Sequence, residues 1–246
     1  MQKHNLDPAT WEQFVASRRT TRDFLPTPIP QELIDQILTD AMTAPSWSNT
    51  RPYLVGIASG DKLQRISNAF LARWEQAAKA LLGGSWGKFK LLITRFGLPK
   101  SDYKVNRRYP VELKPRSARI GAELYGLLGI KRDDHEARQA QWAKNYKFFG
   151  APTSFFIFTH SGLGEYSVSD AGLFMQNLML SAHARGLGTC AQGASALWAD
   201  PVRAEFQVPK GYKLLCGIAI GYPSEDVVNS FEANRLPIAE IKLREN

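Results

Sequence analysis

The stretch Arg18-Arg19-Thr20-Thr21-Arg22 places three guanidinium groups and two hydroxyls within five residues. Arginine presents a planar fork of donors that matches the oxygens of a phosphate, and it stays charged at any working pH. This chemistry would suit the phosphate of a bound cofactor. A basic run is also typical of a solvated helix end, so the pentapeptide alone leaves both interpretations open.

A second cluster of small polar side chains, residues 44–52, lies between a predicted helix and a predicted strand. Ser46 and Asn49 can donate to and accept from the carbonyls and nitrogens of a planar ring, and Trp47 offers a flat apolar surface for it. Loops in such positions often carry ligand contacts, although an ordinary turn between a helix and a strand has a similar composition. The segment is therefore a candidate ligand loop.

The glycine-rich segment 186–193 follows a long predicted helix, and its glycines let the backbone approach a ligand closely. It contains neither the GxxxxGK(S/T) pattern of a nucleoside triphosphate loop nor the GxGxxG pattern of a dinucleotide fold. No histidine or basic residue can be assigned to activate Cys190, so we expect a buried thiol there. The four histidines show no metal-ligand spacing, and the sequence predicts neither a metal site nor a catalytic side chain.

Composition narrows the class of protein. The chain has 246 residues, a hydrophobic fraction of 44% and a formal net charge of +8, which favour a globular protein that attracts anionic ligands. Zinc-ligand spacing, a ribonucleoprotein signature and a recognition-helix pattern are missing, so nucleic acid is not the expected partner. With two cysteines, no apolar leader and no apolar run of bilayer length, we expect a cytoplasmic protein without a membrane partner.

The periodicity of the apolar residues predicts helices interspersed with a few buried strands. We expect helices after the Asp7-Pro8 cap and over 31–42, 62–82, 116–128, 133–149 and 169–185. Buried strands are expected over 53–58, 154–159 and 214–220. Residues 84–150 read as a helical excursion within a single α+β domain that spans residues 1–246.

The order of these segments resembles the FMN-dependent nitroreductase family. The segments are RRTTR near the N-terminus, APSWSNTRP after the next helix, GLGTCAQG in the last third, and GYP followed by Asn234-Arg235-Leu236-Pro237. Asp170-Ala171-Gly172 with Gln176-Asn177-Leu178 is similar to the central helix of that family. The resemblance covers nearly the whole chain, and it depends on the joint order of motifs that are individually unspecific.

The resemblance implies a nitroreductase-like α+β fold, in which helices flank a mixed, mainly antiparallel sheet. It also implies an intertwined homodimer in which two FMN molecules lie at the subunit interface. Arg18, Arg19, Thr20 and Arg22 would hold the phosphate, the ribityl chain or the pyrimidine edge, and Arg235 would add to phosphate binding. The helical excursion would cover the substrate side of the flavin.

The same resemblance assigns the ring of the FMN to the two remaining motifs. Pro45, Ser46, Trp47 and Asn49 would approach the ring from the other subunit. Gln192 and Gly193 would place backbone beside it, where an N–H group can stabilise electron density arriving at N5. Some family members carry a Lys two residues before the C-terminal Arg, where this chain has Ala233, so phosphate neutralisation would depend on the arginines.

The resemblance further implies a ping-pong reaction, in which NAD(P)H reduces FMN and a nitroaromatic, a quinone or a similar planar acceptor reoxidises it. Trp47, Tyr125 and Phe149 would stack on this acceptor, although core packing is the alternative for the last two. Another redox reaction on the same scaffold, such as dehalogenation or substrate oxidation, stays open. So does a basic ligand-binding protein without flavin, and the sequence does not distinguish NADH from NADPH.

Overall fold

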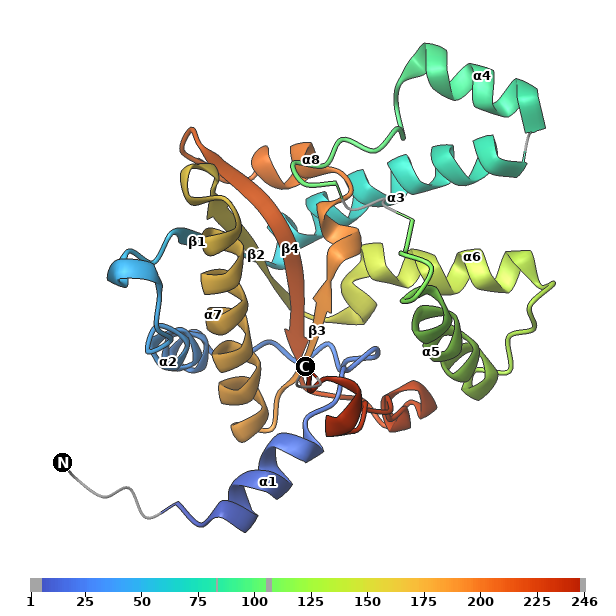
Figure 1. Cartoon of the computed structure of the whole chain (residues 1–246). Coiled ribbons are helices and arrows are strands. Elements are labelled where there is room, and N and C mark those ends of the chain that lie inside the picture. The colour runs from blue at the N-terminus through green and yellow to red at the C-terminus, as the bar shows by residue number, and fades with distance from the viewer. Residues whose placement is uncertain (1–5, 83, 105–107, 244–246) are drawn as a thin grey trace.

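A four-stranded sheet forms the centre of the protein, as seen in a computed structural model that describes residues 6–82, 84–104 and 108–243 (Figure 1). The strands lie in the order β1-β2-β4-β3, and every neighbouring pair is antiparallel. They are β1 (Tyr53–Ser59), β2 (Thr153–His160), β3 (Gly188–Gln192) and β4 (Tyr212–Gly221). Two isolated parallel bridges, Thr20 with Thr189 and Lys100 with Trp198, make the β structure mixed.

The central strand β2 is buried on both faces because its side chains alternate between two apolar layers. Phe155 and Ile157 belong to one layer, whereas Phe156 and Phe158 belong to the other. None of these four side chains is more than 2% exposed. The predicted strand over 154–159, buried on both faces, is therefore confirmed.

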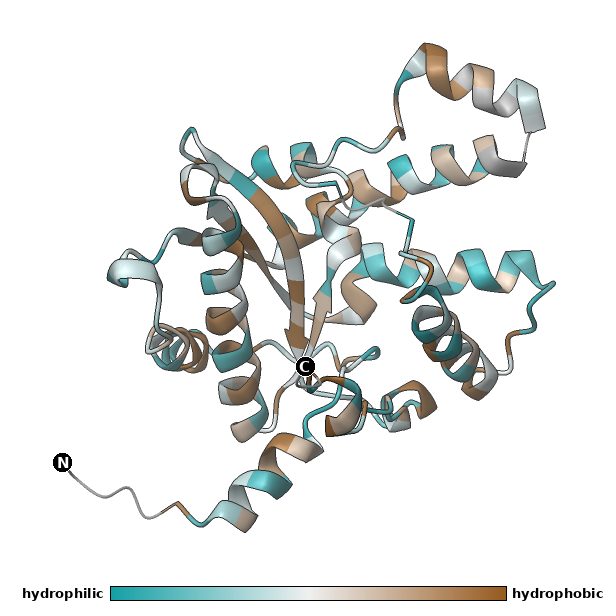
Figure 2. Cartoon of the chain, viewed as in Figure 1, coloured by the Kyte–Doolittle hydropathy of each residue, from teal (hydrophilic) through white to brown (hydrophobic). Residues whose placement is uncertain are grey.

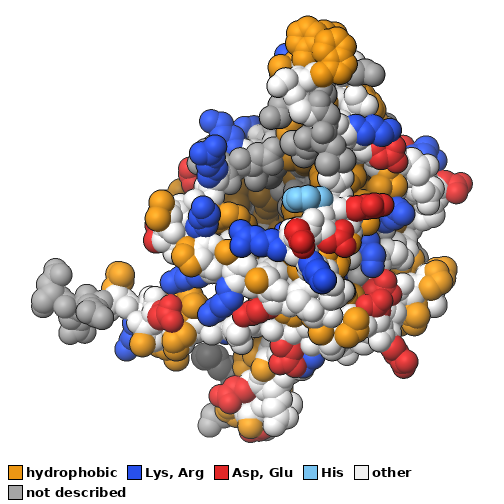
Figure 3. Space-filling view, turned by 90° about the vertical axis from the view of Figure 1, so that its right-hand side faces the viewer, with side chains coloured by type: hydrophobic (Ala, Val, Ile, Leu, Met, Phe, Trp, Pro, Cys, Tyr) orange, Lys and Arg blue, Asp and Glu red, His pale blue; other side chains and the backbone are white. Residues whose placement is uncertain are grey.

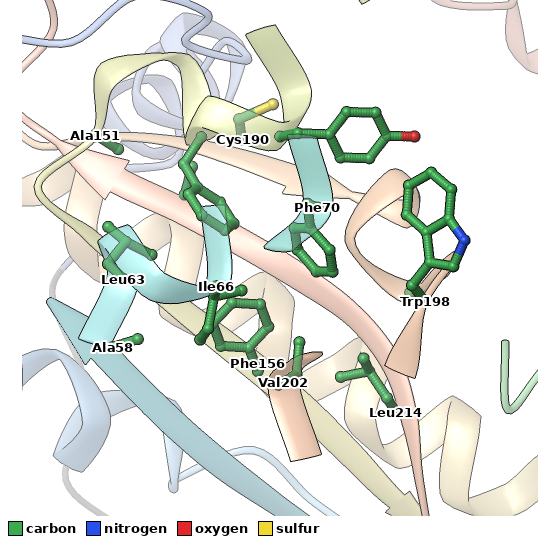
Figure 4. Packing of buried hydrophobic residues seen from close by; sticks show 14 of the residues in the cluster. Ala58, Leu63, Ile66, Phe70, Ala151, Phe156, Cys190, Trp198, Val202 and Leu214 are labelled. Atoms are coloured by element: carbon green, nitrogen blue, oxygen red, sulfur yellow. The ribbon is translucent and has the colours of Figure 1, made fainter. Parts of the chain in front are cut away.

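Helices cover both faces of this sheet and complete its two apolar layers. One layer contains α2 (Gln31–Ala41) and α7 (Glu165–Ala184), and the other contains α3 (Gly60–Leu82), the 3-10 segment η2 (Lys144–Gly150) and α8 (Ala199–Arg203). Figure 4 shows the second layer, where Ile66 and Phe70 of α3 lie against Phe156, Val202 and Leu214. The expected α+β fold with helices flanking a mainly antiparallel sheet is confirmed.

The segment 84–150, predicted as a helical excursion, buries few described side chains apart from those of η2 at its end. It contains α4 (Gly84–Thr94), α5 (Lys114–Leu127) and α6 (His135–Ala143), and the first of these was not expected as a separate helix. Helix α5 has no buried residue, and the one buried residue of α6 is Gln141. In α4, Trp86 and Phe89 stack on each other although they are 75% and 52% exposed. Figure 2 shows this apolar helix standing away from the sheet.

The glycine-rich segment 186–193, which the sequence suggests as a ligand loop, contains the edge strand β3. The strand pairs with β4 from Gly188, opposite Gly221, to Gln192. A Cβ atom at Gly188 would collide with the side chain of Thr21, so glycine allows the arginine cluster to pack directly on the strand. Small residues and glycines give no apolar alternation, and this is why the sequence pattern did not reveal the strand.

The N-terminal helix α1 (Pro8–Ser17) begins as predicted, because the Asp7 carboxylate accepts a hydrogen bond from the N–H of Thr10 at 2.9 Å. Short 3-10 turns connect the larger elements: η1 (Trp47–Asn49), η3 (Ser161–Leu163), η4 (Gly193–Ala196), η5 (Val227–Ser230) and η6 (Ile238–Glu240). Within the described ranges, no helix combines the length and the apolar character that crossing a membrane requires.

Candidate functional site

The arginine cluster lies along the start of the edge strand β3. The N–H of Thr21 donates to the carbonyl oxygen of Thr189 at 3.0 Å, and Thr20 forms an isolated parallel bridge with the same residue. Helix α1 ends immediately before the cluster, because Arg18 has an extended backbone with φ −66° and ψ 122°. The backbone of the cluster is thus fixed to the sheet, and its side chains are held at the edge.

Two guanidinium groups, those of Arg18 and Arg235, lie close enough to repel each other. Burial, and then the charge of Arg235, lower the pKa of the Arg18 guanidinium. In the part of the chain that the structure describes, neither arginine forms an ion pair with a carboxylate, whereas Arg19 pairs with Glu232. Two uncompensated positive charges in one place are the arrangement that a phosphate neutralises.

A pocket of about 260 Å³ opens beside Arg18, and Arg19, Thr189 and His183 are among its other lining residues. The Nε2 atom of His183 lies 2.7 Å from the hydroxyl of Ser17. Burial, and then the charge of Arg18, lower the pKa of the His183 imidazole from 6.5. The imidazole is therefore neutral at pH 7, and the positive charge of the pocket comes from its arginines.

The C-terminal segment that carries Arg235 is tied to the arginine cluster by Asn229. Its Oδ1 atom accepts from the N–H of Arg22 at 2.8 Å, and its Nδ2 group donates to the carbonyl oxygen of Asp23 at 2.8 Å. The Arg22 guanidinium lies 6.0 Å from the centre of the Phe231 ring. Residues more than 200 positions apart in the sequence thereby share one wall of the pocket.

The other end of β3 carries Gln192 and Gly193, next to the turn η4. The Gln192 side chain is 2% exposed, and its Nε2 group donates to the carbonyl oxygen of Asn145 at 2.8 Å. Among the described residues, no hydrogen-bond partner is present for the Gln192 Oε1 or the Ser195 Oγ, and both atoms are buried. Buried polar atoms without partners are costly, and such a position is suited to a ligand that supplies them.

The predicted ligand loop around Trp47 is held in a strained shape. Ser48, Asn49 and Arg51 have φ values of 48°, 57° and 45°, in the left-handed region that costs about 1–3 kcal/mol for residues with a side chain. The Asp170 carboxylate, 5% exposed, accepts from the N–H of Trp47 at 3.0 Å and anchors the loop to α7. Strain of this kind is typical of functional loops.

This loop and the arginine pocket do not meet within one chain. In Figure 1 the loop lies beside α2, on the side of the sheet opposite to α5 and α6, while the arginine cluster follows α1 at the edge strand β3. Pro45 and Asn49 are exposed, and Ser46 is half-buried, with its Oγ accepting from the N–H of Arg51 at 2.9 Å. Trp47 is 52% exposed and packs against Tyr166, with ring centres 4.3 Å apart and ring planes tilted by 40°.

The three aromatic residues expected to stack on a substrate have different surroundings. Trp47 is exposed, and Tyr125 is half-buried beneath the guanidinium of Arg138, 4.2 Å from the ring centre. Phe149 is 6% exposed and belongs to the core layer of Phe156, so its surroundings support the packing role rather than stacking on a ligand. The structure does not bring these three rings together.

Cys190 is a buried thiol of low reactivity, as predicted. It is 4% exposed, and burial raises the pKa of its thiol to about 11 even though Arg22 acts in the opposite direction. Within the described residues, no group of three or more His, Cys, Asp or Glu side chains is placed to hold a metal ion.

Sequence reasoning missed several residues that shape the site. Asp170 was noticed only as part of a helix motif, and nothing in its neighbourhood reveals that it accepts from the N–H of Trp47, 123 positions away. Asn229 was not singled out, and His183 was considered only as a histidine without metal-ligand spacing. Their contacts with Arg22 and Ser17 depend on the tertiary fold, so no local pattern could have identified them.

The fold and the site together define a class of protein: an α+β sandwich whose edge strand carries a phosphate-type pocket at one end and unpaired buried polar atoms at the other. The model of the Nitroreductase family matches residues 15–222. The chain therefore belongs to the nitroreductase family, as the order of its motifs predicts.

Relatives and solved structures resemble the chain over nearly its full length. The "4-nitrobenzoate reductase" of Pseudomonas putida is 33% identical over 232 residues, which are 92% of this chain and 91% of the relative. The FMN-dependent nitroreductase NfnB from Mycobacterium smegmatis, solved in complex with NADPH, is 29% identical with a TM-score of 0.82, covering 98% and 100% of the two chains. The FMN and NADPH-dependent nitroreductase NfnB from "sphigopyxis sp. strain HMH" is 29% identical with a TM-score of 0.81, covering 96% and 98% of the two chains.

Proposed function

We propose that this protein is an FMN-dependent oxidoreductase that uses NAD(P)H to reduce nitroaromatic compounds, quinones or similar planar acceptors. The observation that carries the proposal is the pair of Arg18 and Arg235, two neighbouring guanidiniums without a carboxylate partner in the described chain. Members of the same family with 29% identity are FMN-dependent nitroreductases, and a 33% identical relative is a 4-nitrobenzoate reductase.

The residues present fit an FMN molecule at both of its ends. Arg18 and Arg235 would neutralise the phosphate, while Arg19, Thr20 and Arg22 would hold the remainder of its polar tail. At the ring end, Gln192, Gly193 and Ser195 would face the isoalloxazine. The orphaned Gln192 Oε1 and Ser195 Oγ are an acceptor and a hydroxyl of the kind that a flavin's ring N–H, carbonyl and ribityl groups can satisfy.

Bound FMN supplies the redox chemistry of this family, since it can take a hydride from NAD(P)H and pass electrons to an acceptor. The protein side chains bind and orient the reactants. Gln192 is held by Asn145, which keeps the end of β3 rigid, and water can deliver the protons that the acceptor needs. This division of labour agrees with the absence of a catalytic side chain among the expected site residues.

We also propose that the active form is a homodimer. The loop with Pro45, Ser46, Trp47 and Asn49 is exposed and far from the arginine pocket of its own chain, so a second copy would have to bring it to the flavin. Each chain would form a single domain over residues 1–246, with the excursion over 84–150 on the substrate side. A cytoplasmic location, where NAD(P)H is present, suits this reaction.

The spectrum of the purified protein tests the proposed function. We expect a yellow protein whose flavin absorbance is bleached by NAD(P)H under nitrogen and restored by a nitroaromatic such as 4-nitrobenzoate. Steady-state rates across a panel of nitroaromatics and quinones would then rank the acceptors. A colourless protein that cannot be reconstituted with FMN would reject the proposal.

A further inference from the structure

A basic pocket of about 650 Å³ lies between helices α5 and α6, outside the residues assigned to FMN. Arg119, Arg132 and Arg138 line it together with the ring of Tyr125. Gly121 and Gly126 also line it, and they leave open space because no side chain projects from them. The pocket therefore combines positive charge, an aromatic surface and room for a ring.

The charges of this pocket are largely uncompensated. Within the described residues, neither Arg132 nor Arg138 pairs with a carboxylate, and Arg138 instead lies over the Tyr125 ring at 4.2 Å from its centre. Arg119 has a loose contact with Glu123 at 3.7 Å. The nearby Asp134 is engaged at the start of α6, where it accepts from the N–H of Ala137 at 2.9 Å. An anion next to a flat ring is the ligand that fits these groups.

The α5–α6 unit is attached to both ends of the proposed flavin site. Helix α5 packs against η5, and Arg116 pairs with Glu240 at 3.5 Å, on the C-terminal segment that carries Arg235. Helix α6 runs directly into η2, where the carbonyl oxygen of Asn145 accepts from Gln192. Figure 3 views this face, where Lys and Arg side chains are exposed among Asp and Glu side chains. The helices that form the pocket are thus in contact with the segments that carry Arg235 and Gln192.

We propose that this pocket binds the adenosine 2′-phosphate half of NADPH and makes the protein prefer NADPH to NADH. The adenine would stack on the plane formed by Tyr125 and Arg138, because guanidiniums and aromatic rings both offer flat faces to a base. The 2′-phosphate, which NADH lacks, would accept hydrogen bonds from Arg132 and Arg119. The inference rests on the proposed use of a nicotinamide nucleotide, and it names the residues that select between the two nucleotides.

Steady-state kinetics of the FMN-loaded enzyme test the selection. In Arg132→Ala we expect the KM for NADPH to rise about tenfold or more, since a hydrogen bond to a charged group contributes about 1.5–3 kcal/mol, while the kcat and the KM for NADH should stay unchanged. In Arg138→Ala the KM should rise for both nucleotides, because both carry the adenine that stacks on this side chain. Lys131→Ala, which removes a neighbouring charge outside the pocket, is the matched control and should leave both nucleotides unaffected. Arg138→Lys, which keeps the charge but loses the flat face, should fall between the wild type and Arg138→Ala.

Direct binding of 2′,5′-ADP, measured by calorimetry, separates this inference from the proposed function. The wild type should bind 2′,5′-ADP at least tenfold more tightly than 5′-AMP, and Arg132→Ala should abolish most of that difference, by about 1.4 kcal/mol or more. This titration needs no turnover, so it can succeed even if the redox activity is not found. Equal binding of the two nucleotides would overturn the inference. Arg132→Ala would overturn it as well if it changed the ratio of kcat/KM for 4-nitrobenzoate to that for nitrobenzene while altering the KM for NADPH and for NADH by the same factor, because the pocket would then bind the carboxylate of the acceptor.

Discussion

The sheet and the helical excursion of this protein differ in how many of their side chains are buried. Along β2 every residue but the last is buried, and Phe155 to Phe158 are at most 2% exposed. In the excursion α5 buries no residue, and α4 exposes Trp86, Phe89, Leu92 and Ile93. The sheet is therefore stabilised by its own core, whereas helices α4 and α5 of the excursion gain little from burial within the chain.

The two regions have different roles in the proposed function: the sheet holds the cofactor, and the excursion selects the nucleotide. The proposed cofactor residues are attached to the sheet, because Thr21 and Gln192 lie at the two ends of the same strand, β3. The proposed nucleotide-selecting residues lie on helices α5 and α6 and between them, and none of them is buried. The residues on the sheet would determine which cofactor is bound. Substitutions in the excursion would change which reactants bind next to that cofactor.

Truncation of one aromatic residue in each region tests the difference in burial, and it has the largest expected effect. Phe156→Ala should lower the free energy of unfolding by about 3–5 kcal/mol, because it removes a fully buried ring from the core. Phe89→Ala, at a position that is 52% exposed, should change it by no more than about 0.5 kcal/mol. Urea unfolding at one fixed protein concentration measures both. Equal losses in the two variants would mean that α4 is covered, and the contrast between the regions would be lost.

The arginines at the edge of the sheet provide the next largest effect. Arg18→Ala and Arg235→Ala should each weaken FMN binding by about 1.5–3 kcal/mol, because each leaves phosphate charge without a partner. Arg19→Ala should cost less, since that guanidinium is already paired with Glu232. Quenching of FMN fluorescence on titration into the apoprotein gives the three affinities. The assignment fails if Arg18→Ala and Arg235→Ala bind FMN as tightly as the wild type.

The smallest expected effect is on the titration of His183 beside the same pocket. Its pKa is lowered from 6.5 by burial first and by Arg18 second, so Arg18→Ala should raise it part of the way towards 6.5. Bound FMN should raise it too, because the phosphate offsets the charge of Arg18. NMR titration of the imidazole C–H signals follows both changes. A pKa that neither change moves would place the phosphate elsewhere.

The sign of the linked effect on stability follows from that lowered pKa. As the pH falls below 6.5, the unfolded chain binds a proton at His183 before the folded protein does, so this residue lowers the stability in mild acid. The loss should develop between pH 6.5 and the lower folded pKa, and it should be smaller in Arg18→Ala. Thermal unfolding of the two proteins across this range provides an independent check.

The sequence predicted three strands of the sheet, β1, β2 and β4, but not the edge strand β3. Strong apolar runs located β1, β2 and β4 to within two residues at each end, because burial on both faces needs continuous apolar side chains. The strand β3 was missed, since Gly188 and its small neighbours are selected by the close approach of Thr21 rather than by hydrophobicity. The helix α4 was missed because its apolar residues cover an exposed surface and follow no single buried face.

The site was foreseen as a set of motifs but not as a geometry. The arginine cluster and the segment around Gln192 were recognised, yet their joining by the strand β3 could not be read from either motif alone. The same holds for the anchoring of Trp47 by Asp170 and for the basic pocket around Arg132 and Arg138. Such contacts join residues that are distant in the sequence, and local patterns carry no information about them.

A crystal structure of the FMN-loaded protein tests the central claim most directly. We expect electron density for the FMN phosphate between the side chains of Arg18 and Arg235. We expect density for the FMN ring beside Gln192 and Gly193 of the same chain. We further expect that the loop carrying Asn49 on that ring comes from a second copy of the chain. A phosphate bound away from the arginine pair, or a ring covered by the Asn49 loop of its own chain, would contradict this claim.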